Sequence, residues 1–196
     1  MPTGCNPWAL QPLPLTATHR KAPPMSRSGA VTFKGAPLTL AGEAIKLGQQ
    51  APDFKLHFFK DGMKTISLAD VKGKPTILSV LPSLDTPVCA MQTKKFNETL
   101  GRFGATINAL TVSLDLPFGM NRFCGAENIT NIRPASDYQD RSFGQKYGTL
   151  IEELKIMCRA IFVLDAKGKV TYVEYVPEVT NEPNYDAALA ALKAQL

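Results

Sequence analysis

The spacing of apolar and polar residues predicts strands and helices in alternation along most of the chain. Thr76–Leu81 is a nearly continuous apolar run between Pro75 and Pro82, and such a run is typical of a strand covered on both faces. We therefore expect it to be a central parallel strand. The segments that follow predict, in order, a helix at 87–103, a strand at 105–114 and a helix at 117–129.

Antiparallel structure is predicted at both ends of this region. Short apolar runs at Val31–Phe33 and Leu38–Leu40 predict a β-hairpin, and runs at 156–164 and 170–176 enclose a turn sequence at 165–168. The remaining patterns predict a strand at 54–59, short helices at 67–71 and 142–147, and a C-terminal helix at 185–196. Together they predict an α/β sandwich with a mixed central sheet, flanking helices and an N-terminal β-hairpin.

The net charge of +5 comes almost entirely from the N-terminal end. Residues 1–42 carry four basic side chains and no acidic one, whereas residues 43–196 carry 18 basic and 17 acidic side chains. The larger part of the chain has no surplus of positive charge to neutralise phosphates, which argues against a nucleic-acid partner. No stretch approaches the roughly 20 apolar residues that cross a bilayer, so no membrane span is predicted.

The first thirty residues contain six prolines and little periodic apolar pattern. We therefore predict a disordered tail over 1–30 and one domain over 31–196. Pro12 and Pro14 break the early apolar stretch, and the positive charges follow it, which argues against a secretory signal. We expect a cytoplasmic protein; the acid-poor, basic composition leaves an organelle transit peptide as the alternative, and Met25 is a second candidate for the natural start.

The four cysteines, at positions 5, 89, 124 and 158, are too few and too scattered to staple a secreted domain. The chain has no C-x-x-C pair and only two histidines, so we predict neither a metal site nor a cofactor. The cysteines are therefore candidates for chemistry rather than for structural cross-links.

Cys89 has the most informative surroundings. Thr86 stands where a helix N-cap belongs and Pro87 at the first helical position, which puts Cys89 in the first turn. Unpaired backbone N–H groups and the helix dipole stabilise a thiolate there. Because Thr86 replaces the first cysteine of a C-x-x-C pair, a lone thiolate beside a hydroxyl suits attack on a peroxide. The alternative is that Thr86 and Pro87 only start a helix and Cys89 is a small core residue.

Pro82, Thr86 and Cys89 form the spacing P-x-x-x-T-x-x-C, which is similar to the active-site signature of peroxiredoxins. Further likeness in the N-terminal hairpin, at 115–127 and at 181–185 extends the resemblance over roughly 31–196, and these stretches resemble the thiol peroxidase branch of that family. The resemblance implies a thioredoxin-like core, a hydroperoxide substrate, reduction by thioredoxin and a homodimer. It also implies that Cys89 is the peroxidatic cysteine and that Cys124 resolves it as an intramolecular disulfide.

Arg159 interrupts the apolar run at 156–164, where a guanidinium is costly unless it meets an anion. It pairs either with a carboxylate at the strand end or, as the resemblance implies, with the Cys89 thiolate. Its neighbour Cys158 is predicted to face the other way as an inert core thiol. Without the resemblance, Cys124 is equally well explained as a core thiol.

The other polar residues near these motifs receive no catalytic role. The sequence predicts that they are structural, capping or surface residues: His57, Asp85, Asp115 and Glu127. On the residues alone, two functions compete with peroxide reduction, namely a redox sensor or disulfide carrier and a non-catalytic interaction module.

Overall fold

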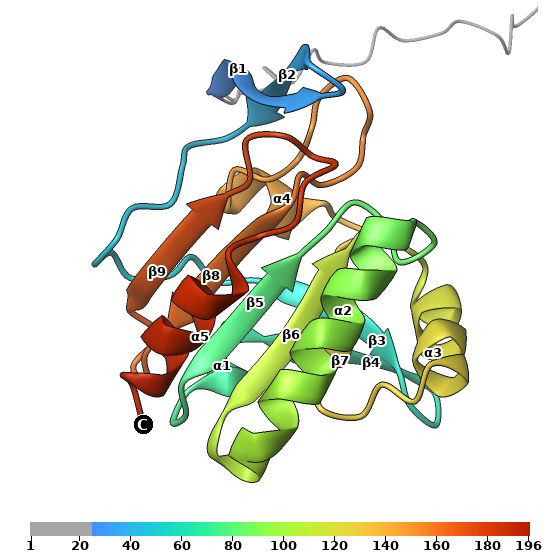
Figure 1. The fold of residues 1–196 in the computed structure, drawn as a ribbon, viewed down its shortest axis with the longest axis vertical. Helices are drawn as coiled ribbons and strands as arrows, with labels where there is room; N and C mark the ends of the chain where they lie inside the picture. The colour runs from blue at the N-terminus through green and yellow to red at the C-terminus, as the bar shows by residue number, and fades with distance from the viewer. Residues whose placement is uncertain (1–24) are drawn as a thin grey trace, which may run out of the picture.

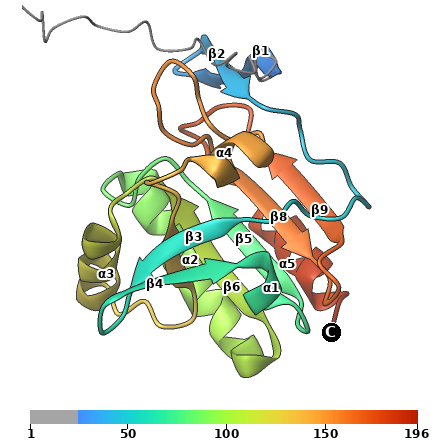
Figure 2. The same ribbon diagram turned by 180° about the vertical axis from the view of Figure 1, so that it is seen from behind.

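The computed structural model describes residues 25–196, so most of the predicted tail lies outside the described residues. The described part has a seven-stranded sheet in the order β4-β3-β7-β6-β5-β8-β9 and a separate two-stranded sheet, β1-β2. Helices α2 and α5 cover one face of the large sheet (Figure 1), and α1 and α4 lie on the other (Figure 2). This arrangement confirms the predicted α/β sandwich with a mixed sheet, flanking helices and an N-terminal hairpin.

Strand β5 lies in the interior of the large sheet, between β6 and β8, as predicted. It runs parallel to β6 and antiparallel to β8, and all five of its residues are buried. The strands of this sheet are β3 (Lys55–Phe59), β4 (Met63–Ser67), β5 (Thr76–Val80), β6 (Asn108–Ser113), β7 (Arg133–Ser136), β8 (Ala160–Leu164) and β9 (Val170–Tyr175).

Two of the helices follow parallel strands and begin with proline at the first helical position, Pro87 in α2 and Pro117 in α3. Proline is tolerated there because that N–H has no partner within the helix. The helices are α1 (Leu68–Val71), α2 (Pro87–Leu100), α3 (Pro117–Ala126), α4 (Ser142–Lys146) and α5 (Tyr185–Lys193), with a 3-10 segment at Gly101–Thr106. Among the described residues, no helix is both long and apolar enough to span a bilayer.

Two strands were not predicted, and a third begins later than predicted. The edge strand β4 has one buried residue, Ile66, and β7 has only four residues, among them Pro134. Neither segment carries an apolar alternation long enough to identify a strand from sequence. Strand β8 begins at Ala160, so Arg159 precedes the strand instead of interrupting it.

The N-terminal hairpin consists of β1 (Ser26–Phe33) and β2 (Ala36–Ala41). Strand β1 therefore starts before the domain boundary predicted at residue 31. The first residues of β1 are polar and give no apolar signal, but the Arg27 guanidinium donates hydrogen bonds to the carbonyls of Gly42 and Gly148. These contacts with distant backbone hold the start of the strand.

Candidate active site

Cys89 lies in the first turn of α2, directly after the loop that leaves the carboxyl end of β5. Thr86 has the extended backbone of an N-cap residue, and its carbonyl accepts the N–H of Ala90 at 2.9 Å. The Thr86 hydroxyl does not cap the helix; it donates to the carbonyl of Ser83 at 3.1 Å. Cys89 is the third residue of α2 and is fully buried. It therefore lies in the first turn, where the backbone N–H groups have no partner within the helix.

A buried guanidinium faces this thiol. Arg159 is 1% exposed, and its Nη2 lies 3.4 Å from Sγ of Cys89. The carbonyl of Val179 accepts from Nη2 at 3.1 Å and from Nε at 3.3 Å, and Nη1 donates to Oε1 of Gln92. The sequence left two partners open for Arg159, a carboxylate or the Cys89 thiolate. Among the described residues, Cys89 is in contact with it, and its hydrogen bonds include no carboxylate.

Gln92 belongs to the site although the sequence analysis did not single it out. It is fully buried one turn after Cys89, and its Nε2 donates to the Ser79 hydroxyl at 2.7 Å. That bond fixes which way the amide faces and turns Oε1 toward Arg159. The sequence shows a glutamine three residues after the cysteine, which places both on one face of the helix. Its role could not be predicted, because its partners Ser79 and Arg159 lie on β5 and before β8.

Asp115 holds the loop between β5 and α2. Its carboxylate accepts the Ser83 hydroxyl at 2.7 Å, the Leu84 N–H at 2.8 Å and the Ser113 hydroxyl at 2.8 Å. The sequence predicts no catalytic role for Asp115, only a loop, cap or surface position, and these contacts could not be predicted from it. The position was nevertheless suggestive, because the carboxyl ends of the parallel strands β5 and β6 meet at one edge of the sheet.

An apolar cleft of about 500 Å³ opens beside the cysteine. Three of the predicted site residues line it, Pro82, Thr86 and Arg159. The remaining lining residues come from the start of α2, from the loop before β8, from the segment after β9 and from the hairpin: Pro87, Val88, Leu154, Ile156, Val179, Thr180 and Phe33. If the polar end of a small molecule were held at Arg159, an organic substituent on that molecule would therefore lie against the apolar walls of the cleft.

Cys124 lies outside this cleft. It is 9% exposed on α3 and lines a separate cavity of about 340 Å³ with Phe58 and Phe59 of β3. Burial raises the pKa of the Cys124 thiol to about 11. Met120, one turn earlier on α3, packs in the same apolar cluster as Cys89, so the two cysteines belong to neighbouring clusters.

Cys158 is fully buried in the main core, and burial raises the pKa of its thiol to about 12. All three described cysteines, Cys89, Cys124 and Cys158, are free thiols. The predicted site residues Pro82, Thr86, Cys89 and Arg159 thus come together, and Cys124 lies on the adjacent helix.

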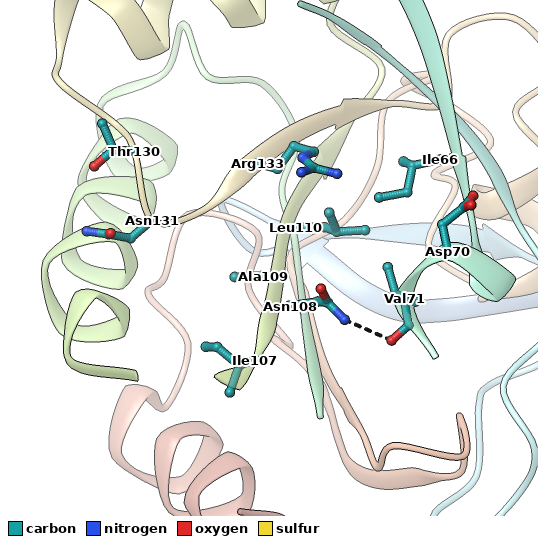
Figure 3. A pocket seen from close by; sticks show the side chains of 10 residues that line it. All are labelled: Ile66, Asp70, Val71, Ile107, Asn108, Ala109, Leu110, Thr130, Asn131 and Arg133. Atoms are coloured by element: carbon teal, nitrogen blue, oxygen red, sulfur yellow. Dashed lines mark hydrogen bonds between the residues drawn. The ribbon is translucent and has the colours of Figure 1, made fainter. Parts of the chain in front are cut away.

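Another hollow, of about 200 Å³, lies at the opposite end of the parallel strands (Figure 3). It has a polar wall, but the Asn108 amide there donates to the carbonyl of Val71 at 2.8 Å and Asp70 accepts the N–H of Ser67. None of the predicted site residues lines it. Within residues 25–196, no three His, Cys, Asp or Glu side chains cluster as metal ligands would.

Comparison with known proteins identifies the family of this chain. Residues 46–189 match the Redoxin family model. The thiol peroxidase of Bacillus subtilis (strain 168) is 49% identical over 164 residues, which are 84% of this chain and 96% of that protein. A peroxiredoxin-like protein from Aquifex aeolicus is 40% identical, with a TM-score of 0.79 over 87% of this chain and 98% of its own.

A thiol peroxidase from Chromobacterium violaceum, 22% identical, shares the fold with a TM-score of 0.74 over 84% of this chain and 95% of its own. The thioredoxin-like fold that the resemblance implied is therefore confirmed. From the matched family and the close relatives, the chain belongs to the thiol peroxidases of the redoxin family, enzymes that reduce peroxides with cysteine thiols.

Proposed function

We propose that Cys89 is the peroxidatic thiol of this enzyme and that Cys124 resolves it within the same chain. The observation that carries the proposal is the Arg159 guanidinium, which lines the apolar cleft and lies 3.4 Å from the buried Cys89 sulfur. A guanidinium taken out of water requires an anion or several acceptors. Its acceptors here are two neutral oxygens and the sulfur, so the thiolate supplies the missing negative charge.

In the first step, the Cys89 thiolate attacks the terminal oxygen of the hydroperoxide, and the O–O bond breaks. The sulfur becomes a sulfenic acid, and the remaining oxygen takes a proton and leaves as an alcohol or as water. The Thr86 hydroxyl already donates its proton to Ser83, so its oxygen is free to accept the O–H of the peroxide. The ring of Pro82 closes the cleft beside the reacting atoms.

In the second step, the Cys124 sulfur displaces hydroxide from the sulfenic acid, which forms a Cys89–Cys124 disulfide and water. The two thiols belong to different helices, α2 and α3, and Cys124 lines a cavity that does not include Cys89. A disulfide needs Cα atoms within about 7 Å. Part of α3 must therefore leave its place on the sheet. Gly125 near the end of α3 supports this step because glycine weakens a helix by about 1 kcal/mol.

An external dithiol must then return two electrons and two protons to the disulfide. We propose thioredoxin as this reductant, since unwinding of α3 would bring the buried disulfide to the surface. The three free cysteines of the described chain suit the reducing cytoplasm, which is the location we propose.

We also propose a homodimer. Leu116 and Phe118, at the start of α3, are 57% and 58% exposed, and such apolar residues favour a protein contact. Sedimentation velocity of the reduced protein tests this, with Phe118→Ser expected to shift the species toward monomer; a monomeric parent protein contradicts it.

The central experiment is peptide mapping after one equivalent of peroxide, together with a non-reducing denaturing gel. We expect a monomer band and a Cys89–Cys124 peptide. A disulfide-linked dimer would contradict resolution within one chain, and a Cys89–Cys158 peptide would identify a different resolving thiol. Hydrogen exchange should rise at residues 117–126 on oxidation, because α3 loses its packing.

A further inference from the structure

The carboxylate of Glu178 joins the N-terminal hairpin to the rest of the molecule. It accepts hydrogen bonds from the Thr32 hydroxyl at 2.7 Å and from the N–H groups of Lys34 and Gly35 at 3.1 Å each. Thr180 adds its N–H at 3.1 Å and its hydroxyl at 2.8 Å. One side chain thus collects the polar groups of the hairpin turn and of the segment after β9.

The turn suits this contact. Lys34 and Gly35 both have positive φ angles, 51° and 80°, which is the backbone of the two-residue turn preferred in β-hairpins. Lysine is uncommon in that conformation, since its Cβ crowds the backbone. The hydrogen bonds to Glu178 offset this cost and point both N–H groups of the turn toward the carboxylate.

The backbone on each side of Glu178 continues the connection. The N–H of Thr32 donates to the carbonyl of Pro177 at 2.7 Å, and the N–H of Val179 donates to the carbonyl of Thr32 at 2.9 Å. The next residue of the hairpin, Phe33, lines the cleft, and the carbonyl of Val179 holds the Arg159 guanidinium. A single short segment therefore fixes one wall of the cleft as well as one contact of the arginine.

Phe33 is the one hairpin residue among the residues that line the cleft, and it is 39% exposed. No hydrogen bond can hold a phenylalanine side chain in place, so its position depends on the pairing of Thr32 with the segment around Glu178. An alkyl or aryl substituent on a hydroperoxide would lie against this ring. Hydrogen peroxide has no substituent and would not reach it.

We propose that Glu178 is a positioning residue for substrate selectivity: by anchoring the hairpin it holds Phe33 in the cleft wall and favours organic hydroperoxides over hydrogen peroxide. This rests on the proposed role of Cys89 and its cleft. The carboxylate is available at neutral pH, because the Thr32 hydroxyl and then the Gly35 N–H lower the pKa of Glu178 to about 2. The stability that the ionised Glu178 carboxylate adds to the folded chain is fully present above the ordinary pKa of a glutamate, near 4.5. It is lost only as the pH falls toward 2.

The test compares Glu178→Gln, Glu178→Asp and Phe33→Ala in the full chain, and measures the rate of Cys89 oxidation by rapid mixing with cumene hydroperoxide and with hydrogen peroxide. Glu178→Gln keeps the length but places an NH₂ against N–H donors, whereas Glu178→Asp keeps the charge. We expect Glu178→Gln and Phe33→Ala to slow the reaction with cumene hydroperoxide about tenfold, the scale of one lost apolar contact. The rate with hydrogen peroxide should stay within about twofold, and Glu178→Asp should lie between Glu178→Gln and the parent.

The double variant, Glu178→Gln with Phe33→Ala, should lose no more than either single variant, because both changes remove the same contact. Equal slowing on both peroxides would overturn the proposal, since it would place the effect on Arg159 and the thiol instead of on the substituent. An unchanged ratio in Phe33→Ala would overturn it as well. Failure of the proposed function itself would appear differently, as peroxide consumption that survives in Cys89→Ser.

Discussion

Cys89 and Cys124 are two buried thiols on two helices that follow adjacent parallel strands, yet their surroundings differ in kind. Cys89 is the third residue of α2 and faces Arg159 across 3.4 Å. Cys124 is near the end of α3 among apolar residues, and burial raises its pKa to about 11. Position on a helix and one buried cation therefore separate a thiol suited to attack from a thiol that burial keeps protonated.

The same contrast gives the order of events in the proposed cycle. A thiol with a pKa of about 11 is almost entirely protonated at neutral pH, so Cys124 neither competes for peroxide nor condenses early. Release of α3 would return it to water and to an ordinary pKa near 8.5. In the proposed cycle, burial of Cys124 would therefore delay the second step until the first has been completed.

The largest effect should come from Cys89→Ser, which removes the thiol that faces Arg159. An alcohol without a strong base is a far poorer nucleophile than a thiolate, so peroxide consumption should fall below about one per cent of the parent rate. A peroxide-depletion assay measures it, with Cys158→Ser as the matched control, which should keep nearly full activity. Substantial activity in Cys89→Ser would assign the nucleophile to another residue.

Cys124→Ser should leave the first turnover intact and stop the second. Without the resolving thiol, the sulfenic acid on Cys89 persists and excess peroxide converts it to sulfinic acid. Mass spectrometry of the intact protein should show one added oxygen at one equivalent and two at excess. Sustained turnover of this variant with thioredoxin would mean that the resolving thiol lies elsewhere.

Arg159→Met should slow peroxide reduction at pH 7 by about ten- to a hundredfold, because the lost cation no longer stabilises the Cys89 anion. The rate should recover toward alkaline pH as the thiolate forms without help. Stopped-flow rates across pH 5–10 check this, and circular dichroism confirms folding. Arg159→Lys keeps the charge but not the planar donors, so its rate should lie between those of the parent and of Arg159→Met. A pH profile of Arg159→Met equal to the parent's would remove Arg159 from the mechanism.

The smallest effect is expected for Asp115→Asn. The amide keeps one acceptor for the loop but loses the charge that strengthens three hydrogen bonds, a change of about 1–2 kcal/mol. We expect a reaction that is slower by about five- to thirtyfold with the same pH profile, because the change displaces the loop before the thiol and leaves Arg159 in place. A shifted profile would mean that Asp115 acts on the charge of the site instead.

The sequence was most informative where the signal is local. The buried central strand, the proline that opens α2 and the cysteine in its first turn are all readable within fifteen residues. The resemblance implied the contact of Arg159 with Cys89, but the other partners of Arg159 could not be predicted, because Gln92 and Val179 lie 67 and 20 residues away. The edge strand β4 and the proline-containing strand β7 were missed for a different reason, since they bury too few side chains to produce a pattern.

The bond between Thr32 and Glu178 joins residues 146 positions apart, which has a consequence for the newly made chain. At about 5–20 residues per second, a ribosome needs roughly seven to thirty seconds to produce the intervening segment. During that time the hairpin has no carboxylate to dock against, and the Val179 carbonyl that holds Arg159 does not yet exist. The nascent protein therefore carries Cys89 without the Arg159 guanidinium while the next 70 residues are added, and the reactive site is completed only when the last strand and its following segment emerge.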